Sequence, residues 1–147
     1  MLRNIVKTDG NYGSLFLRLG LGIVFFPHGA QKVLGWFGGP GFSKTLQIFQ
    51  TKMHFPLVLV ILLMITEFFG SLCLIAGFLT RIWALGIGIS ITICAYLNHI
   101  KNGFFMNWFG MQKGEGVEYH ILAVALVLGL IVLGGGGLSL DRAMSKE

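Results

Sequence analysis

Four apolar segments, each long enough to cross a lipid bilayer, constrain this sequence more than any other feature. They cover residues 14–36, 56–78, 81–98 and 118–137. A crossing helix needs roughly 20 predominantly apolar residues, and a segment surrounded by lipid must satisfy its own backbone hydrogen bonds, which a helix does. The sequence therefore predicts an all-α fold, an integral membrane four-helix bundle that forms a single transmembrane domain over residues 1–147.

The composition agrees with a membrane protein. Hydrophobic residues make up 54% of the chain and charged residues 12%, whereas soluble domains average about 25% charged residues. The formal net charge of +5 comes from scattered basic residues, so we expect contact with the lipid bilayer and no binding of nucleic acid. No signal-peptide cleavage site follows the first apolar run, and we expect the first helix to stay in the protein.

The number of crossings sets the topology. Four crossings put both termini on one side of the membrane and two long loops, residues 37–55 and 99–117, on the other. Basic residues are slightly more frequent on the side of the termini, which favours cytoplasmic termini under the positive-inside rule. Small residues four apart, such as Gly86 and Ser90, predict close packing of the helices in one bundle, and further association into a homo-oligomer stays open.

Glu67 is the most unusual polar residue, because it lies in the middle of the second apolar segment. An ionised carboxylate at this depth is costly, so we expect it to face the bundle interior and to pair with Arg18, His28 or Lys32. Arg18 lies close to the side of the termini, where it can extend its head group to the membrane surface. A purely structural pair is the alternative to a proton relay. The candidate residues for an intramembrane polar or proton-relay path are Arg18, Glu67, Glu118 and His120.

Polar and aromatic residues gather at the membrane face opposite the termini. His28, Gln31 and Lys32 share one helical face just after Pro27, and the two long loops are rich in glycine and aromatic residues. A pocket at this face is one interpretation, and an ordinary interfacial belt of aromatic residues is the other. The candidate ligand-binding residues are His28, Gln31, Lys32, Trp36, His99, Asn102 and Trp108.

Several motifs resemble those of the DoxX family of small bacterial membrane proteins. They are RLGLGIVFFPHGAQKVLGWFGGPG at residues 18–41, the mid-helix Glu67, GFLTR at 77–81, NGFFMNWFG at 102–110 and EYH at 118–120. The resemblance implies a four-helix, multi-pass protein of the bacterial inner (plasma) membrane. It also implies a link to redox systems, since members of this family form the membrane subunit of a thiosulfate:quinone oxidoreductase, associate with a superoxide dismutase and a sulfurtransferase, or respond to quinones and catechols.

The residues also limit the chemistry. We identify no catalytic residue, and the sequence has neither a CxxC motif nor a glycine-rich dinucleotide motif, so a redox role requires a partner protein and a bound cofactor. Quinone is the favoured cofactor, because histidine, lysine and asparagine can donate to its carbonyl oxygens. Haem held by His28 with His99 or His120 is disfavoured. No metal site is expected, because Glu118 and His120 do not share a helix face. Cys73 and Cys94 are interpreted as buried apolar residues.

Three functions stay open. The first is a quinone-binding or accessory membrane subunit of an oxidoreductase that acts with a redox partner protein, and it predicts an aromatic cavity open to lipid near His28, Trp36, Asn102 and Trp108. The second is a non-catalytic scaffold that anchors soluble partners, with exposed, ordered loops and no cavity. The third is a small transporter, with a continuous polar path from Arg18 through Glu67 to His28. We favour the first.

Overall fold

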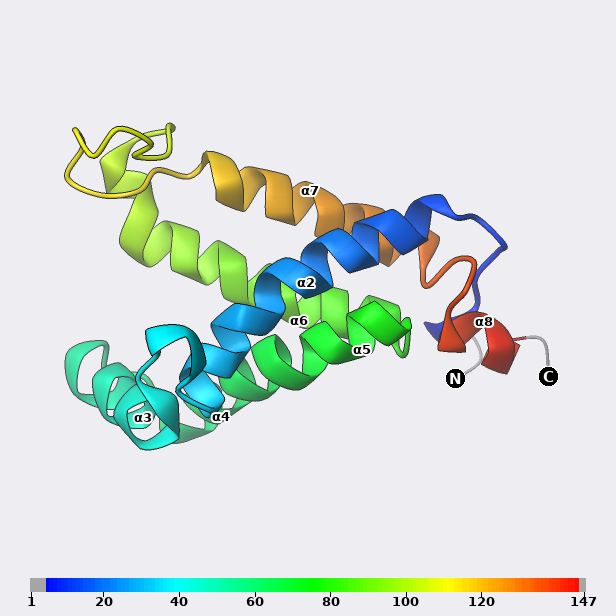
Figure 1. Cartoon of the computed structure of the whole chain (residues 1–147), viewed down its shortest axis with the longest axis horizontal. Coiled ribbons are helices and arrows are strands. Elements are labelled where there is room, and N and C mark those ends of the chain that lie inside the picture. Colours follow the sequence, from blue (N-terminus) through cyan, green and yellow to red (C-terminus); the bar gives the residue numbers. More distant parts are fainter. Residues whose placement is uncertain (1–4, 146–147) are drawn as a thin grey trace.

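The structure of the protein is a computed structural model that describes residues 5–145. The described residues contain helices and no strand, which confirms the all-α prediction (Figure 1). The elements are α2 (Gly13–Val33), η1 (Trp36–Gly38), α3 (Gly41–Lys52), α4 (Leu57–Ile65), η2 (Thr66–Gly70), α5 (Ser71–Ala76), α6 (Thr80–Cys94), η3 (Ala95–His99), η4 (Ile100–Asn102), α7 (Glu118–Leu133) and α8 (Leu140–Ser145). Two of them, η2 and η3, are short π-helices that continue α4 and α6.

Three continuous helical rods are long and apolar enough to cross a membrane: Gly13–Val33, Leu57–Ala76 and Thr80–Asn102. The fourth, α7, is apolar but has only 16 residues. At a rise of about 1.5 Å per residue it spans roughly 24 Å, somewhat less than the hydrocarbon core of a bilayer. The predicted membrane bundle is therefore present, with one crossing shorter than the sequence suggested.

The structure corrects three predicted boundaries. The predicted fourth segment, 118–137, ends as a helix at Leu133, because Gly134 takes a φ of 73°, outside the helical region. The third rod continues through the π-helix to Asn102 instead of ending near residue 98. The predicted loop 37–55 contains α3, whose mixture of polar and apolar residues lacks the hydropathy of a membrane segment. Only Thr45 of α3 is buried, and its hydroxyl donates to the Lys32 carbonyl oxygen at 3.2 Å.

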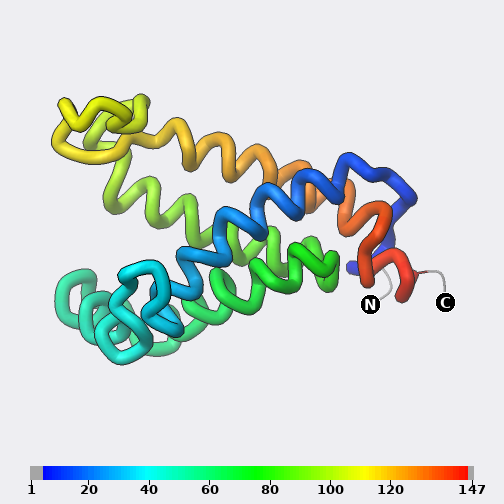
Figure 2. Tube along the Cα trace, viewed as in Figure 1, coloured from blue at the N-terminus to red at the C-terminus, as the bar shows by residue number. Residues whose placement is uncertain are grey.

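The helices form two arms, one made of α6 and α7 and the other of α3, α4, η2 and α5. The arms meet near the termini and diverge at the opposite end, as Figures 1 and 2 show. In the cartoon, α2 lies between them, packed against α5 and η2 on one side and α7 on the other, while α6 packs against α7. The core joins the arms where they converge. Its buried side chains are Leu21, Phe25, Leu74, Ala84, Ile87, Ile91, Ala123, Val127 and Leu130.

Arg18 holds the converging ends together, and the structure differs here from the expected surface-directed side chain. Its relative exposure is 0%. All three guanidinium nitrogens donate to backbone carbonyl oxygens at the end of α5 and in the segment before α8. The acceptors are Leu74 at 3.3 Å, Ile75 at 2.7 Å, Gly135 at 2.9 Å, Gly137 at 3.2 Å and Leu138 at 2.7 Å. Leu74 and Ile75 lie in the last turn of α5, where backbone carbonyl groups have no hydrogen-bond partner within the helix.

Two further charged residues complete the same end of the molecule. The buried Asp141 accepts hydrogen bonds from the backbone N–H groups of Leu79 at 2.7 Å and Thr80 at 2.9 Å, and so caps the start of α6. Arg81 donates to the carbonyl oxygens of Ile131 at 2.8 Å and Val132 at 3.1 Å, near the end of α7. The chain segments next to both termini therefore lie at one end of the bundle, as the topology predicted.

Candidate functional site

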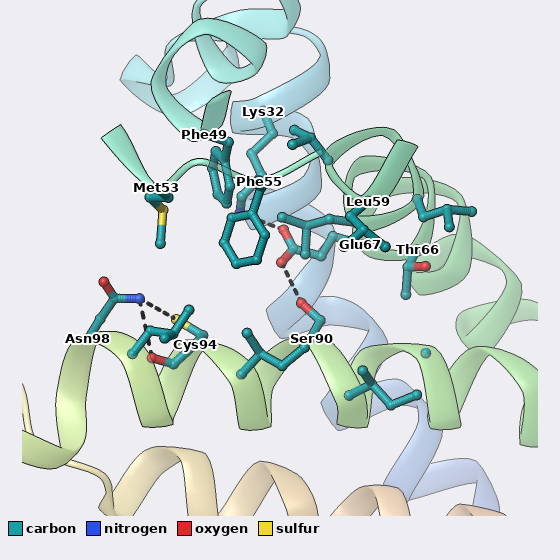
Figure 3. Close-up of a pocket in the computed structure, with 17 residues that line it drawn as sticks. Lys32, Phe49, Met53, Phe55, Leu59, Thr66, Glu67, Ser90, Cys94 and Asn98 are labelled. Atoms are coloured by element: carbon teal, nitrogen blue, oxygen red, sulfur yellow. Dashed lines mark hydrogen bonds and ion pairs between the residues drawn. The ribbon is translucent and has the colours of Figure 1, made fainter. Parts of the chain in front are cut away.

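A cavity of about 410 Å³ lies between α4 and α6, in the gap between the two arms (Figure 3). Aliphatic side chains of α4 and α6 form most of its wall, and Phe49, Met53 and Phe55 from the end of α3 and the following linker form another part. Ile89 is 54% exposed and Ile93 is 44% exposed, so the cavity reaches the outer surface of the helices. Its volume lies within the range of about 300–1,000 Å³ that is typical of small-molecule sites.

An ion pair lies at the inner wall of this cavity. The Lys32 Nζ lies 2.5 Å from Glu67 Oε2, and the Ser90 hydroxyl donates to Glu67 Oε1 at 3.1 Å (Figure 3). The Glu67 side chain is only 8% exposed, and that of Lys32 is 20% exposed. The expectation that Glu67 faces the interior and pairs with one of three bases is confirmed, and the partner is Lys32. The cavity thus offers a charged, hydrogen-bonding end inside apolar walls.

Local backbone structure brings these side chains together. Glu67 belongs to the π-helix η2, a rare conformation that is frequent at functional sites. Gly29 lets α2 approach η2 closely, because a Cβ atom at this position would lie 2.5 Å from the Phe68 backbone nitrogen. Lys32 follows Gly29 by three residues, so it lies on the same face of α2 and reaches Glu67. The glycine and the π-helix together place the ion pair.

A second polar cluster lies at the far end of α6 and α7. The rings of His99 and His120 have centroids 4.3 Å apart. The His99 Nδ1 donates to the Glu115 carbonyl oxygen at 3.0 Å, and the Asn102 side-chain amide donates to the same oxygen at 3.0 Å. Two of the predicted ligand residues, His99 and Asn102, are therefore neighbours here, outside the cavity wall.

The remaining predicted ligand residues lie in separate places. His28 is exposed on α2, and the Gln31 side chain donates to the Phe37 carbonyl oxygen at 3.3 Å. Trp36 is 54% exposed at the start of η1, while Trp108 is 78% exposed in the loop that precedes α7. Of the seven residues, only Lys32 lines the cavity.

The four candidates for a relay also lie apart. Arg18 donates to carbonyl groups near the termini, Glu67 pairs with Lys32, Glu118 Oε1 accepts from Trp108 Nε1 at 3.1 Å, and His120 contacts His99. Apolar Leu21 and Phe25 occupy the buried face of α2 beyond Arg18. The described residues therefore show no continuous polar path from Arg18 to Glu67, which the transporter hypothesis requires.

Ser90, Cys94 and Asn98 line the cavity, although sequence reasoning did not propose them as site residues. The sequence predicts Ser90 only as a small residue that allows close helix packing. The third rod carries a residue of this face at every fourth position, namely Gly86, Ser90, Cys94 and Asn98. This spacing is the sequence pattern from which the cavity-lining face could have been predicted.

Comparison with known proteins agrees with this architecture. The sequence model of the DoxX family matches residues 13–100. The chain is 29% identical over 142 residues to the "Inner membrane protein YqjF" of Escherichia coli (strain K12), a match that covers 97% of this chain and 99% of that relative. No solved structure matches the chain. The matched residues include α2, the Glu67 π-helix and the cavity wall of α6, and the chain belongs to the DoxX family.

Proposed function

We propose that this protein is a quinone-binding or accessory membrane subunit of a redox system in the bacterial inner membrane, with its termini in the cytoplasm. The cavity between α4 and α6 is the single observation that carries this proposal. It has apolar and aromatic walls, an opening on the outer surface of the helices and one buried polar end. An apolar ring compound with carbonyl oxygens matches this distribution. The membrane location rests on the apolar helices and on the similarity to an inner membrane protein.

The residues have distinct parts in this proposal. The Lys32 ammonium group donates a hydrogen bond to a quinone carbonyl oxygen, while the Asn98 amide is a second donor on the opposite wall. Glu67 holds the Lys32 side chain at the cavity through their ion pair and is the candidate proton-relay residue beside the ring. Phe49 and Phe55 cover the ring. Electrons come from a partner protein, because this sequence carries no redox motif of its own.

Two matched variants of α6 test the cavity. Ile93 and Ile82 are 44% and 45% exposed, and only Ile93 lines the cavity. The Ile93→Trp variant places an indole in the cavity, whereas Ile82→Trp adds the same bulk elsewhere on the helix. The probe is a short-chain ubiquinone with one isoprene unit, and its binding to the purified full chain in detergent is measured by equilibrium dialysis.

The expected result is saturable binding by the wild type and the Ile82→Trp variant, and binding at least about tenfold weaker in Ile93→Trp. A tenfold loss of affinity corresponds to about 1.4 kcal/mol of binding free energy. An indole ring that occupies the cavity should reduce binding by at least this amount. Equal binding by both variants would place the quinone elsewhere. Absence of saturable binding by the wild type would refute the proposal and favour the scaffold function. The exposed loop that holds Trp108 would then be the first surface to search for a partner.

A further inference from the structure

Three potential metal ligands converge near the end of α6 and the start of α7, at the end of the bundle opposite the chain segments next to the termini. Cys94 is the last residue of α6, His99 ends η3, and His120 lies in the first turn of α7. One ligand atom from each residue lies within 4.8 Å of the other two. The three side chains come from two different rods, so their meeting is a product of the fold.

The His120 side chain of this cluster is almost fully buried. Its relative exposure is 5%, and its Nδ1 is buried without a hydrogen-bond partner among residues 5–145. Most buried polar atoms in proteins are hydrogen-bonded, so each exception requires an explanation. A metal ion bound to this nitrogen supplies one.

His99 has the arrangement of a metal-ligating histidine. Its Nδ1 donates to the Glu115 carbonyl oxygen at 3.0 Å, which leaves the lone pair of Nε2 available. Ligating histidines almost always donate their other ring N–H to such an acceptor, which fixes the ring. Asn102 donates to the same carbonyl oxygen at 3.0 Å and so holds the acceptor in place.

The π-helix η3 brings Cys94 and His99 to the same side of the third rod. Residues five apart on an α-helix are separated by about 140° around its axis, because each residue turns the chain by roughly 100°. A π-helix is wider and its hydrogen bonds join residues five apart, so such residues come close to alignment. Ring packing explains why His99 and His120 lie together, but it does not explain why the Cys94 thiol lies beside them.

We propose that Cys94, His99 and His120 form a binding site for Zn²⁺, with a fourth coordination position open. One thiolate and two imidazoles are ligands that zinc prefers, whereas Mg²⁺ and Ca²⁺ require oxygen ligands. Ligand atoms around a tetrahedral zinc ion lie roughly 3.3–3.8 Å apart. Side-chain rotations that move the ligand atoms by about 1 Å would therefore bring them to coordination distance. The sequence disfavoured a metal because it paired His120 with Glu118, and the structure pairs it with Cys94 instead. Cys94 also lines the cavity, so the ion lies beside it, but the site does not depend on quinone binding.

The test uses the full chain, purified in detergent without a polyhistidine tag and treated with a chelator. Zn²⁺ binding is measured by isothermal titration, and Co²⁺ is added as a spectroscopic probe of thiolate coordination. The variants Cys94→Ser and His120→Asn remove single ligands. Cys73→Ser and His54→Asn are matched controls, because Cys73 and His54 are a free cysteine and an exposed histidine outside the cluster.

The expected result is one Zn²⁺ per chain in the wild type and both controls. Each ligand variant binds more than about 100-fold more weakly, since even loss of an outer-shell partner costs 10- to 100-fold. Co²⁺ gives a thiolate charge-transfer band that Cys94→Ser lacks. Three outcomes would overturn the proposal: no stoichiometric Zn²⁺ binding by the wild type, unchanged affinity in Cys94→Ser when its circular dichroism matches the wild type, or Co²⁺ binding without the thiolate band.

Discussion

Replacing Lys32 with methionine removes the positive charge next to a carboxylate that is 8% exposed. Glu67 would keep only the hydrogen bond from Ser90, at 3.1 Å. Loss of one partner of a buried ion pair costs about 3–5 kcal/mol, because the other charge stays buried without compensation. The end of the Lys32 side chain is partly exposed, and we therefore expect the lower limit, about 3 kcal/mol of unfolding free energy.

The reverse substitution has a smaller effect. Glu67→Gln preserves shape, and its amide oxygen can still accept hydrogen bonds from Ser90 and Lys32, so we expect a loss of about 1–2 kcal/mol. The double variant leaves no unpaired charge, and its cost should be about 2 kcal/mol rather than the sum of the two single costs. The coupling energy between Lys32 and Glu67 is then about 2–3 kcal/mol, within the range for directly interacting residues.

Equilibrium unfolding of the four proteins by sodium dodecyl sulfate in mixed micelles, followed by circular dichroism, measures this cycle. Ser90→Ala is the control, because it removes one neutral donor and should cost about 1 kcal/mol. If the single costs of the Lys32 and Glu67 variants add to within about 0.5 kcal/mol of the double variant, the pair is not energetically coupled and the interpretation of the site is wrong.

Three further tests, one of them with a control substitution, examine how the helices are held. Arg18→Lys loses the planar fork that reaches five carbonyl oxygens, and it should cost about 2–4 kcal/mol, seen as a lower Tm. Gly29→Ala should lower Tm because its Cβ would meet the Phe68 backbone, whereas Gly20→Ala, with nothing within 4 Å, should leave Tm unchanged or raise it, and equal effects would contradict the close approach of α2 to η2. Asp141→Asn replaces one of the two accepting oxygens of the α6 cap with a donor and should cost about 1–2 kcal/mol, measured by thermal unfolding.

The crossings and the position of Glu67 could be predicted because both depend on local sequence. Hydropathy over about 20 residues sets where a chain can cross a bilayer, and a mid-segment carboxylate must turn inward whatever the rest of the fold is. The sequence places His28 and Glu67 at similar depth on neighbouring antiparallel helices, and Lys32, one turn from His28, is one of the three expected partners. These inferences need no knowledge of how the helices are arranged in the plane of the membrane.

The cavity and the Cys94 cluster could not be predicted in the same way. Both depend on π-helices, η2 and η3, and no pattern in the sequence marks where a helix widens by one residue. The sequence also suggested that the two long loops share one pocket, since both are rich in glycine and aromatic residues. In the structure, η1 with Trp36 lies between α2 and α3, whereas Trp108 lies in the loop that connects η4 to α7, and these two segments are apart because the bundle diverges at this end (Figure 1). That divergence is a property of tertiary packing.

The contacts of Arg18 have a consequence for the biogenesis of this protein. Arg18 lies in the first membrane segment, but its acceptors Gly135 and Leu138 follow it by 117 and 120 residues. While the ribosome is still translating the later helices, the guanidinium group has none of these acceptors, and a charged side chain within a membrane segment is costly without partners. The first helix therefore enters the membrane with an incomplete set of partners. The last part of the chain to be synthesised completes that set, so assembly of the bundle finishes only after translation of its C-terminal segment.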